Sequence, residues 1–199
     1  YSTIATYGNG AWGILAQSVG GGGGMAADPS LPLYLPSLQA ANQVAGDNSL
    51  TNGGNLSVEL HAGGSISTSG NYAHGLVAQS VGGSGGIAIV NGQLAIGNSY
   101  SFNYSPDAQY YAGAGGTIII NLDAGSYIST SGKGSVGIIA QSTGGTQYAS
   151  NGSIQISISG NVIGGTGSDA AGIIVSGGGN SLVAPNTITI NSGGFVQTQ

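Results

Sequence analysis

A nine-residue segment, Gly-Leu-Val-Ala-Gln-Ser-Val-Gly-Gly at residues 75–83, constrains the fold more than any other part of the sequence, because it recurs. Near-identical copies lie 62 residues earlier, at 13–21, and 62 residues later, at 137–145. A degenerate fourth copy, Gly-Ile-Ile-Val-Ser-Gly-Gly-Gly, follows after a further 35 residues, at 172–179. A fixed repeat of this kind is typical of a chain that stacks one structural unit on the next.

Two alternating segments precede the copies of this motif. Residues 66–70 and 128–132 both read Ile-Ser-Thr-Ser-Gly, and residues 4–8 are the matching stretch before the first copy. Further upstream, apolar and small polar residues alternate at 56–60, 118–122, 154–158 and 187–190. Alternation with many β-branched residues predicts half-buried strands, and the glycines and asparagines between these segments are typical of turns.

Three strands per repeat predict an all-β fold: a right-handed parallel β-helix (β-solenoid) in which each repeat forms a three-sided coil. Successive coils of such a fold lie about 4.8 Å apart. We expect one domain, residues 1–199, that is a single segment of a longer repeat protein, because the chain opens inside a repeat. One ladder of side chains should point into the core from the position after the motif glycine, occupied by Ile14, Leu76, Ile138 and Ile173.

The number of coils in each 62-residue repeat has two interpretations. If the 35-residue spacing before the fourth copy is the minimal coil, each longer repeat is one coil plus an excursion of about 30 residues. Alternatively, the repeat holds three coils of about 20 residues, a size close to known solenoid repeats. We favour one coil, because the loop or hairpin excursions, at about 22–54 and 83–115, share their length but not their sequence.

The first excursion contains the only helix that we expect. Residues 31–36, Leu-Pro-Leu-Tyr-Leu-Pro, should be extended, because each proline restricts the residue before it. Residues 37–46 are then predicted to form a short helix, which Ser37 caps at its N-terminus and Gly46 ends.

The second excursion combines a hairpin with a cluster of aromatic residues. Residues 87–96 hold Asn-Gly between alternating apolar residues, which predicts a β-hairpin with a type I′ turn. Aromatic side chains then alternate, so that a strand would place their rings on one face, where they could stack on sugars or on other chains. The alternative role for these rings is to cover the flank of the solenoid. The candidate partner contact comprises Tyr100, Phe102, Tyr104, Tyr110 and Tyr111.

The charge content excludes several classes of function. Charged residues are 4% of the chain, the net charge is −5, and Lys133 is the single basic residue. One cation cannot neutralise a phosphate backbone, so nucleic acid is not an expected partner. No apolar run is long enough to span a bilayer, and the absence of cysteine excludes a disulfide framework.

Candidate acids and bases are few and scattered. Glu59 and Asp123 end the same type of strand segment, but they are offset by two positions, so we expect solvated, diagonal neighbours at most. His74 stands before the motif glycine, where the other copies have Trp, Val and Ala, which is typical of a coil corner rather than of a catalytic group. His61 is the only other histidine, and a metal site needs three or four converging ligands. We therefore expect no enzymatic activity, no cofactor and no bound metal.

The motif Gly-Ile/Leu-x-Ala-Gln-Ser-Val, followed by glycines and preceded by Ile-x-Thr-Ser-Gly, resembles the glycine-rich repeats of autotransporter-type bacterial surface adhesins. Residues 13–24 and 75–83 match best, the third copy has Thr143 in place of Val, and the fourth lacks the Ala-Gln pair. The resemblance covers the strand segments, about half of the chain, but not the excursions. It implies a passenger region at the bacterial cell surface or outside the cell, attached to a membrane only through a region outside this chain.

The sequence and the resemblance together predict a non-enzymatic structural or adhesive module that mediates adhesion or filament assembly. Its expected partners are a second copy or neighbouring repeats of the same protein, and a glycan or a host or bacterial surface. End-to-end association is expected, because unpaired strand edges at the ends of a solenoid favour pairing with another chain. The alternative function is a carbohydrate-active β-helix enzyme or a phage-type spike, whose site would need clustered acids.

Overall fold

The computed structural model describes residues 2–20, 51–83, 113–144, 150–177 and 185–199, together with the backbone of β3 (Gly23–Ala27), β7 (Gly85–Val90) and β8 (Gln93–Asn98). This part of the chain forms β-strands and contains no helix. The extended segment predicted at 31–36 and the helix predicted at 37–46 lie outside the described residues.

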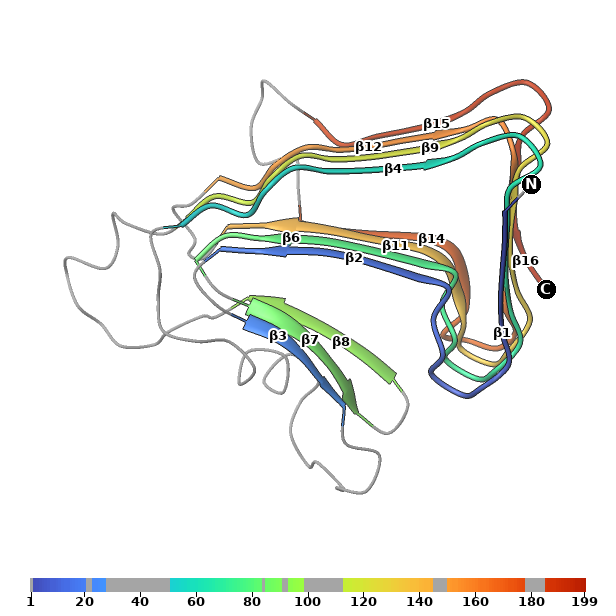
Figure 1. Ribbon diagram of the computed structural model, residues 1–199, viewed down its shortest axis with the longest axis horizontal. Helices are drawn as coiled ribbons and strands as arrows, with labels where there is room; N and C mark the ends of the chain where they lie inside the picture. Colours follow the sequence, from blue (N-terminus) through green and yellow to red (C-terminus); the bar gives the residue numbers. More distant parts are fainter. Residues whose placement is uncertain are drawn as a thin grey trace.

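Most of the strands belong to three parallel sheets. Figure 1 shows these sheets edge-on, with the strands of each sheet lying nearly on top of one another. The first sheet contains, in order, β1 (Thr3–Thr6), β5 (Ser65–Thr68), β10 (Tyr127–Thr130), β13 (Asn161–Gly164) and β16 (Phe195–Thr198). The second contains β2 (Ile14–Val19), β6 (Leu76–Val81), β11 (Val136–Thr143) and β14 (Ala171–Gly177). The third contains β4 (Leu56–Leu60), β9 (Ile118–Leu122), β12 (Ile154–Ile158) and β15 (Thr187–Ile190).

The chain visits these three sheets in rotation. We call one visit to the third, first and second sheets in turn a pass, so that the first described pass contains β1 and β2, the second β4, β5 and β6, and the third β9, β10 and β11. Neighbouring strands within each sheet are parallel, so that Leu76 pairs with Ile14 of the preceding pass and with Ile138 of the following pass. Ile138 pairs in turn with Ile173. The predicted ladder is therefore confirmed, and residues 62 positions apart lie in adjacent strands of one sheet, as one turn through the three sheets per 62 residues requires. The interpretation with three coils per repeat is wrong, because Leu76 and Ile138 are direct partners.

The three sheets surround one hydrophobic core (Figure 1). Alternate residues of each strand point into it, as the burial of β9 illustrates: Ile118, Ile120 and Leu122 are buried, and the residues between them are half-buried. The same positions of β12 hold Ile154, Ile156 and Ile158, which are also buried. The two-residue period of the sequence thus becomes stacked apolar ladders.

The first glycine of the motif is required by close packing at the junction of the first and second sheets. A Cβ atom on Gly75 would overlap the Cγ2 methyl of Ile128 and would lie 2.6 Å from the carbonyl oxygen of Gly137. Gly13 and Gly137 meet Ile66 and Val162 in the same way. The repeat of glycine along the sequence therefore reflects a repeated approach of backbone to a β-branched side chain.

The motif serine joins the second sheet to the segment that enters the third. Ser80 Oγ donates to the Gly54 carbonyl at 2.8 Å and accepts from the Gly116 amide at 2.8 Å. Ser142 Oγ likewise donates to the Gly116 carbonyl and accepts from the Gly152 amide. Each hydroxyl therefore satisfies backbone groups of two successive passes at once.

The motif glutamines form a ladder between passes. Gln17 Nε2 donates to Gln79 Oε1 at 2.6 Å, and Gln79 Nε2 donates to Gln141 Oε1 at 2.7 Å. Gln79 and Gln141 are buried although they alternate with core-facing residues. Val77 and Ile139, which alternate with the core in the same way, are buried too. The second sheet is therefore covered on both faces in its middle passes.

A small sheet of order β3-β7-β8, the side sheet, lies beside the outer face of the second sheet in Figure 1. Its strands β3 and β7 are parallel and keep the 62-residue register, with Gly23 opposite Gly85. Strands β7 and β8 are antiparallel, with Ile87 opposite Ile96, so the predicted hairpin is confirmed in its strand pairing.

Candidate functional site

The predicted partner contact lies outside the described residues. Tyr100, Phe102, Tyr104, Tyr110 and Tyr111 all follow β8 in the second excursion, and the structure describes none of them. The hairpin that precedes these residues is in place, because β7 and β8 pair as expected. The assignment of these rings to a partner contact therefore stays a prediction.

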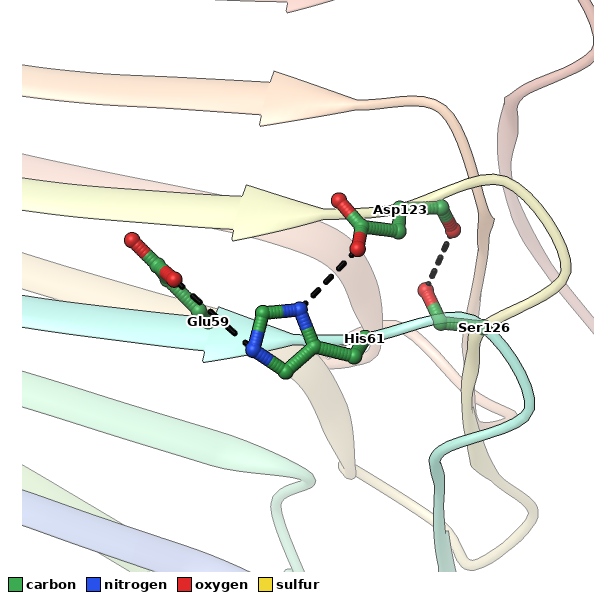
Figure 2. Close-up of polar contacts among 4 residues, drawn as sticks. All are labelled: Glu59, His61, Asp123 and Ser126. Carbon is green, nitrogen blue, oxygen red and sulfur yellow. Dashed lines mark hydrogen bonds and ion pairs between the residues drawn. The ribbon is translucent and has the colours of Figure 1, made fainter. Parts of the chain in front are cut away.

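The densest group of charged side chains among the described residues joins the second pass to the third (Figure 2). His61 Nδ1 lies 3.0 Å from Asp123 Oδ2, and His61 Nε2 lies 3.9 Å from Glu59 Oε2. Glu59 belongs to β4, His61 follows the end of β4, and Asp123 follows the end of β9. We call these three residues the acid–histidine cluster.

Strand register explains the geometry of this cluster. Glu59 of β4 pairs with Asn121 of β9, so His61 and Asp123 occupy equivalent positions of successive passes. The expected diagonal relation between Glu59 and Asp123 is confirmed, since the two acids are offset by two positions. The direct contact between His61 and Asp123 was missed by the sequence reasoning, although their separation of 62 residues equals the repeat length.

The surroundings of the cluster limit its chemistry. The side chains of His61, Glu59 and Asp123 are 77%, 54% and 53% exposed, so water screens their charges and the pairs contribute little to stability. The carboxylates face different nitrogens of the imidazole (Figure 2), so the three side chains do not converge on one point. Ser126, the nearby hydroxyl in Figure 2, donates to the Asp123 backbone carbonyl at 2.7 Å. Among the described residues, no group of three or more ligating side chains is arranged to hold a metal ion.

The second histidine, His74, has the opposite environment. It lies just before β6, at the corner between the first and second sheets, as its position in the repeat predicts, but it is only 3% exposed. Its Nδ1 accepts a hydrogen bond from the Val136 amide at 3.1 Å, and its ring lies 5.9 Å from that of Trp12. Burial lowers the pKa of His74 from 6.5 to about 4, so the imidazole is neutral at pH 7.

Neither histidine has a nucleophile beside it among the described residues. The hydrogen bonds of these rings within the described part of the chain are made with Asp123 by His61 and with the Val136 amide by His74, and no serine or threonine hydroxyl described there is bonded to either ring. The acid–histidine cluster lies on the exposed face of the third sheet, and His74 is enclosed at a corner.

Among the residues that the structure describes, no helix is long and apolar enough to cross a membrane. Comparison with known proteins finds no family model, no curated protein and no solved structure that matches this chain.

Proposed function

We propose that this chain is a non-enzymatic structural module of a bacterial cell-surface or extracellular fibre protein, built as a right-handed parallel β-helix, and that it mediates adhesion or filament assembly. The observation that carries the proposal is the in-register pairing of every pass with the next in three parallel sheets. Such stacking makes each pass a template for its neighbour and suits an extended, stiff body.

The handedness follows from a general rule of parallel sheets. Strands β1 and β5 are neighbours in one sheet and are joined through β2 and β4 in the other two sheets. Connections between parallel strands of one sheet are right-handed in the great majority of proteins, because strand twist favours that path. The coil formed by each pass is therefore assigned as right-handed.

The composition of the framework supports a structural role. The polar side chains that recur at the motif positions make hydrogen bonds within the chain. The motif glutamines bond to one another between passes, and the motif serines bond to the backbone that enters the third sheet. The excursions are the segments of the chain that do not contribute strands to the three parallel sheets. Contact with a glycan, a cell surface or a second copy is accordingly assigned to them, with the aromatic group after β8 as the leading candidate.

The test combines shape with adhesion. Because the strands stack along the shortest dimension of the chain (Figure 1), rods should appear in negative-stain images where copies associate end to end. Beads that carry the chain should adhere to bacterial or polysaccharide-coated surfaces or cluster with one another. Beads coated with heat-unfolded chain are the control. Compact round particles together with beads that neither adhere nor cluster would contradict the proposal.

A carbohydrate-active enzyme is the alternative function, and the acid–histidine cluster is the observation that would favour it. The discriminating variant is the double change Glu59→Gln and Asp123→Asn, which removes both carboxylates without changing their size. The structural proposal expects no release of reducing sugar from polysaccharides by either protein. Hydrolysis by the unaltered chain that the double variant abolishes would establish the enzyme instead.

A further inference from the structure

The corner that carries His74 contains a polar arrangement that the structural role does not require. Position 74 is equivalent to Trp12 and Val136 in the neighbouring passes. Trp12 and Val136 both belong to an apolar cluster on this side of the second sheet. The imidazole of His74 is buried beside this cluster, with its ring next to that of Trp12. A titratable ring therefore occupies a position that hydrocarbon or indole side chains fill elsewhere.

The hydrogen bonds of this ring fix its protonation state. Nδ1 accepts from the Val136 amide, so that nitrogen carries no proton, and the proton of the neutral ring is on Nε2. Nε2 is buried and has no hydrogen-bond partner among the described residues. The imidazole is thus enclosed in the one neutral form that can hold the Val136 amide.

The bond made by Nδ1 joins two passes at the start of a strand. Val136 is the first residue of β11, and its amide donates to the imidazole of the preceding pass. Further bonds connect the same corners. Ser135 Oγ accepts from the Ala73 amide and donates to the Gly70 carbonyl, and the Gly75 amide donates to the Val136 carbonyl. Only the His74 bond can be removed by a proton, since a second proton on the ring must bind at Nδ1.

Among the described residues, no charged side chain is bonded to this ring. The titratable side chains at the corresponding corners of the described passes are Tyr7, Tyr72 and Lys133, with Asp169 before β14. None of these four is bonded to the imidazole, and Tyr7, Lys133 and Asp169 are exposed. Protonation would therefore place an unpaired cation beside Trp12 and leave a buried amide without an acceptor.

We propose that His74 is an acid-sensitive link between the second and third passes, in which protonation of Nδ1 releases the Val136 amide and loosens the start of β11. The proton comes from solvent and forms an N–H bond at Nδ1, and no bond between heavy atoms changes. The link is closed at neutral pH and opens in acid, because an opened corner exposes the imidazole to water and lets it take up the proton. This inference does not depend on the adhesive function proposed above.

Amide hydrogen exchange of the ¹⁵N-labelled chain at pH 7 and pH 4 tests this link. With a pKa of 6.5 in the open corner and about 4 in the closed corner, the protection of the Val136 amide should fall by up to about 100-fold over this range. The reference is the Ile118 amide, which donates to the Ser153 carbonyl in the third sheet and faces no titratable acceptor. A fall in protection shared equally by Val136 and Ile118 would overturn the proposal.

Two asparagine variants make the test specific. His74→Asn keeps an acceptor near the position of Nδ1 that cannot take up a proton at these pH values, so Val136 should stay protected at pH 4. His61→Asn removes the exposed histidine and should leave the acid response unchanged. An acid response that survives in His74→Asn, or that disappears in His61→Asn, would contradict the assignment.

The unaltered chain provides a second measurement should His74→Asn fail to fold. Its imidazole ¹⁵N shifts should show Nδ1 without a proton at pH 7, and the Val136 amide shift should change with the same midpoint as His74. A protonated Nδ1 at pH 7, or a Val136 amide that does not respond to the titration of His74, would overturn the proposal.

Discussion

Gly75 lies directly against the Cγ2 methyl of Ile128, with no room between them for a Cβ atom. The methyl belongs to the first sheet of the next pass, so this contact fixes how closely the first and second sheets meet at their shared corner. A side chain at position 75 would have to displace either Ile128 or the Gly137 backbone.

Gly75→Ala should therefore destabilise the chain by about 1–3 kcal/mol, the usual penalty for an overpacked core. Urea unfolding should show a lower midpoint with an unchanged slope. Gly8→Ala is the matched control, because a Cβ there would make only an ordinary contact, 3.5 Å from Ala11 Cβ. Equal stability of the two variants would contradict the role assigned to the motif glycine.

Tyr72 is the only non-glycine residue with a positive φ among the described residues, at 53°. The equivalent residues in the neighbouring passes are glycines, Gly10 with a φ of 66° and Gly134 with a φ of 67°. A left-handed conformation costs an L-residue about 1–2 kcal/mol, and glycine avoids this cost. Tyr72 also places its ring over Gly134, where a Cβ atom would meet the ring.

We expect Tyr72→Gly to be more stable than Tyr72→Ala by about 1 kcal/mol, although glycine is less stable than alanine at most positions. Both variants lose the ring, so their difference isolates the backbone conformation. Thermal unfolding of the two proteins side by side gives the comparison. A more stable alanine variant would show that the corner relaxes out of the left-handed conformation.

Ser80 and Ser18 occupy the same motif position but differ in burial and in their partners among the described residues. Ser80 is buried and bonds to both Gly54 and Gly116, whereas half-buried Ser18 accepts one bond, from the Gly54 amide at 2.7 Å. Ser80→Ala leaves the buried Gly116 amide without its acceptor and should cost about 1–3 kcal/mol. Ser18→Ala should cost less, because water can reach the freed amide. Similar losses in chemical denaturation would argue against the burial-dependent role.

Much of the three-sheet framework could be predicted, because the residues that form its strands recur at a fixed spacing in the sequence. A spacing of 62 residues places Leu76 beside Ile14 and Ile138 whatever the path of the excursions, and alternation decides which side chains face the core. The 62-residue spacing also places His61 beside Asp123, a contact between a histidine and an acid that a comparison of acids alone does not find. Repeat length is thus a direct guide to which residues meet across passes.

Features that depend on a second layer could not be predicted. Gln79, Val77 and Ile139 look like outward-facing residues of a one-layer solenoid, yet they are buried. The burial of His74, and with it the low pKa, has the same origin, because no local pattern says that a corner is enclosed. The β7–β8 hairpin of the side sheet could be predicted from its Asn-Gly turn. The pairing of β3 with β7 was not predicted, although these strands keep the 62-residue register.

The aromatic group of the second excursion gives the last prediction, which concerns residues outside the described part of the chain. Two roles are open: the rings contact a partner, or they anchor the excursion on the framework. If they contact a partner, changing Tyr100, Phe102 and Tyr104 together to Ser should leave the melting temperature nearly unchanged and abolish adhesion or assembly. If they are an anchor, Phe102→Ala alone should cost about 3–5 kcal/mol, as the loss of a buried ring does.

The pairing of β7 with β8 ends at Asn98, just before these rings, so one triple variant distinguishes the two roles. The two measurements, thermal unfolding and bead adhesion, are made on the same triple variant. The Asp107→Asn variant is the control, since it changes the same excursion without removing a ring. A triple variant that loses thermal stability and still adheres would refute the partner contact and would assign the rings to packing within the chain.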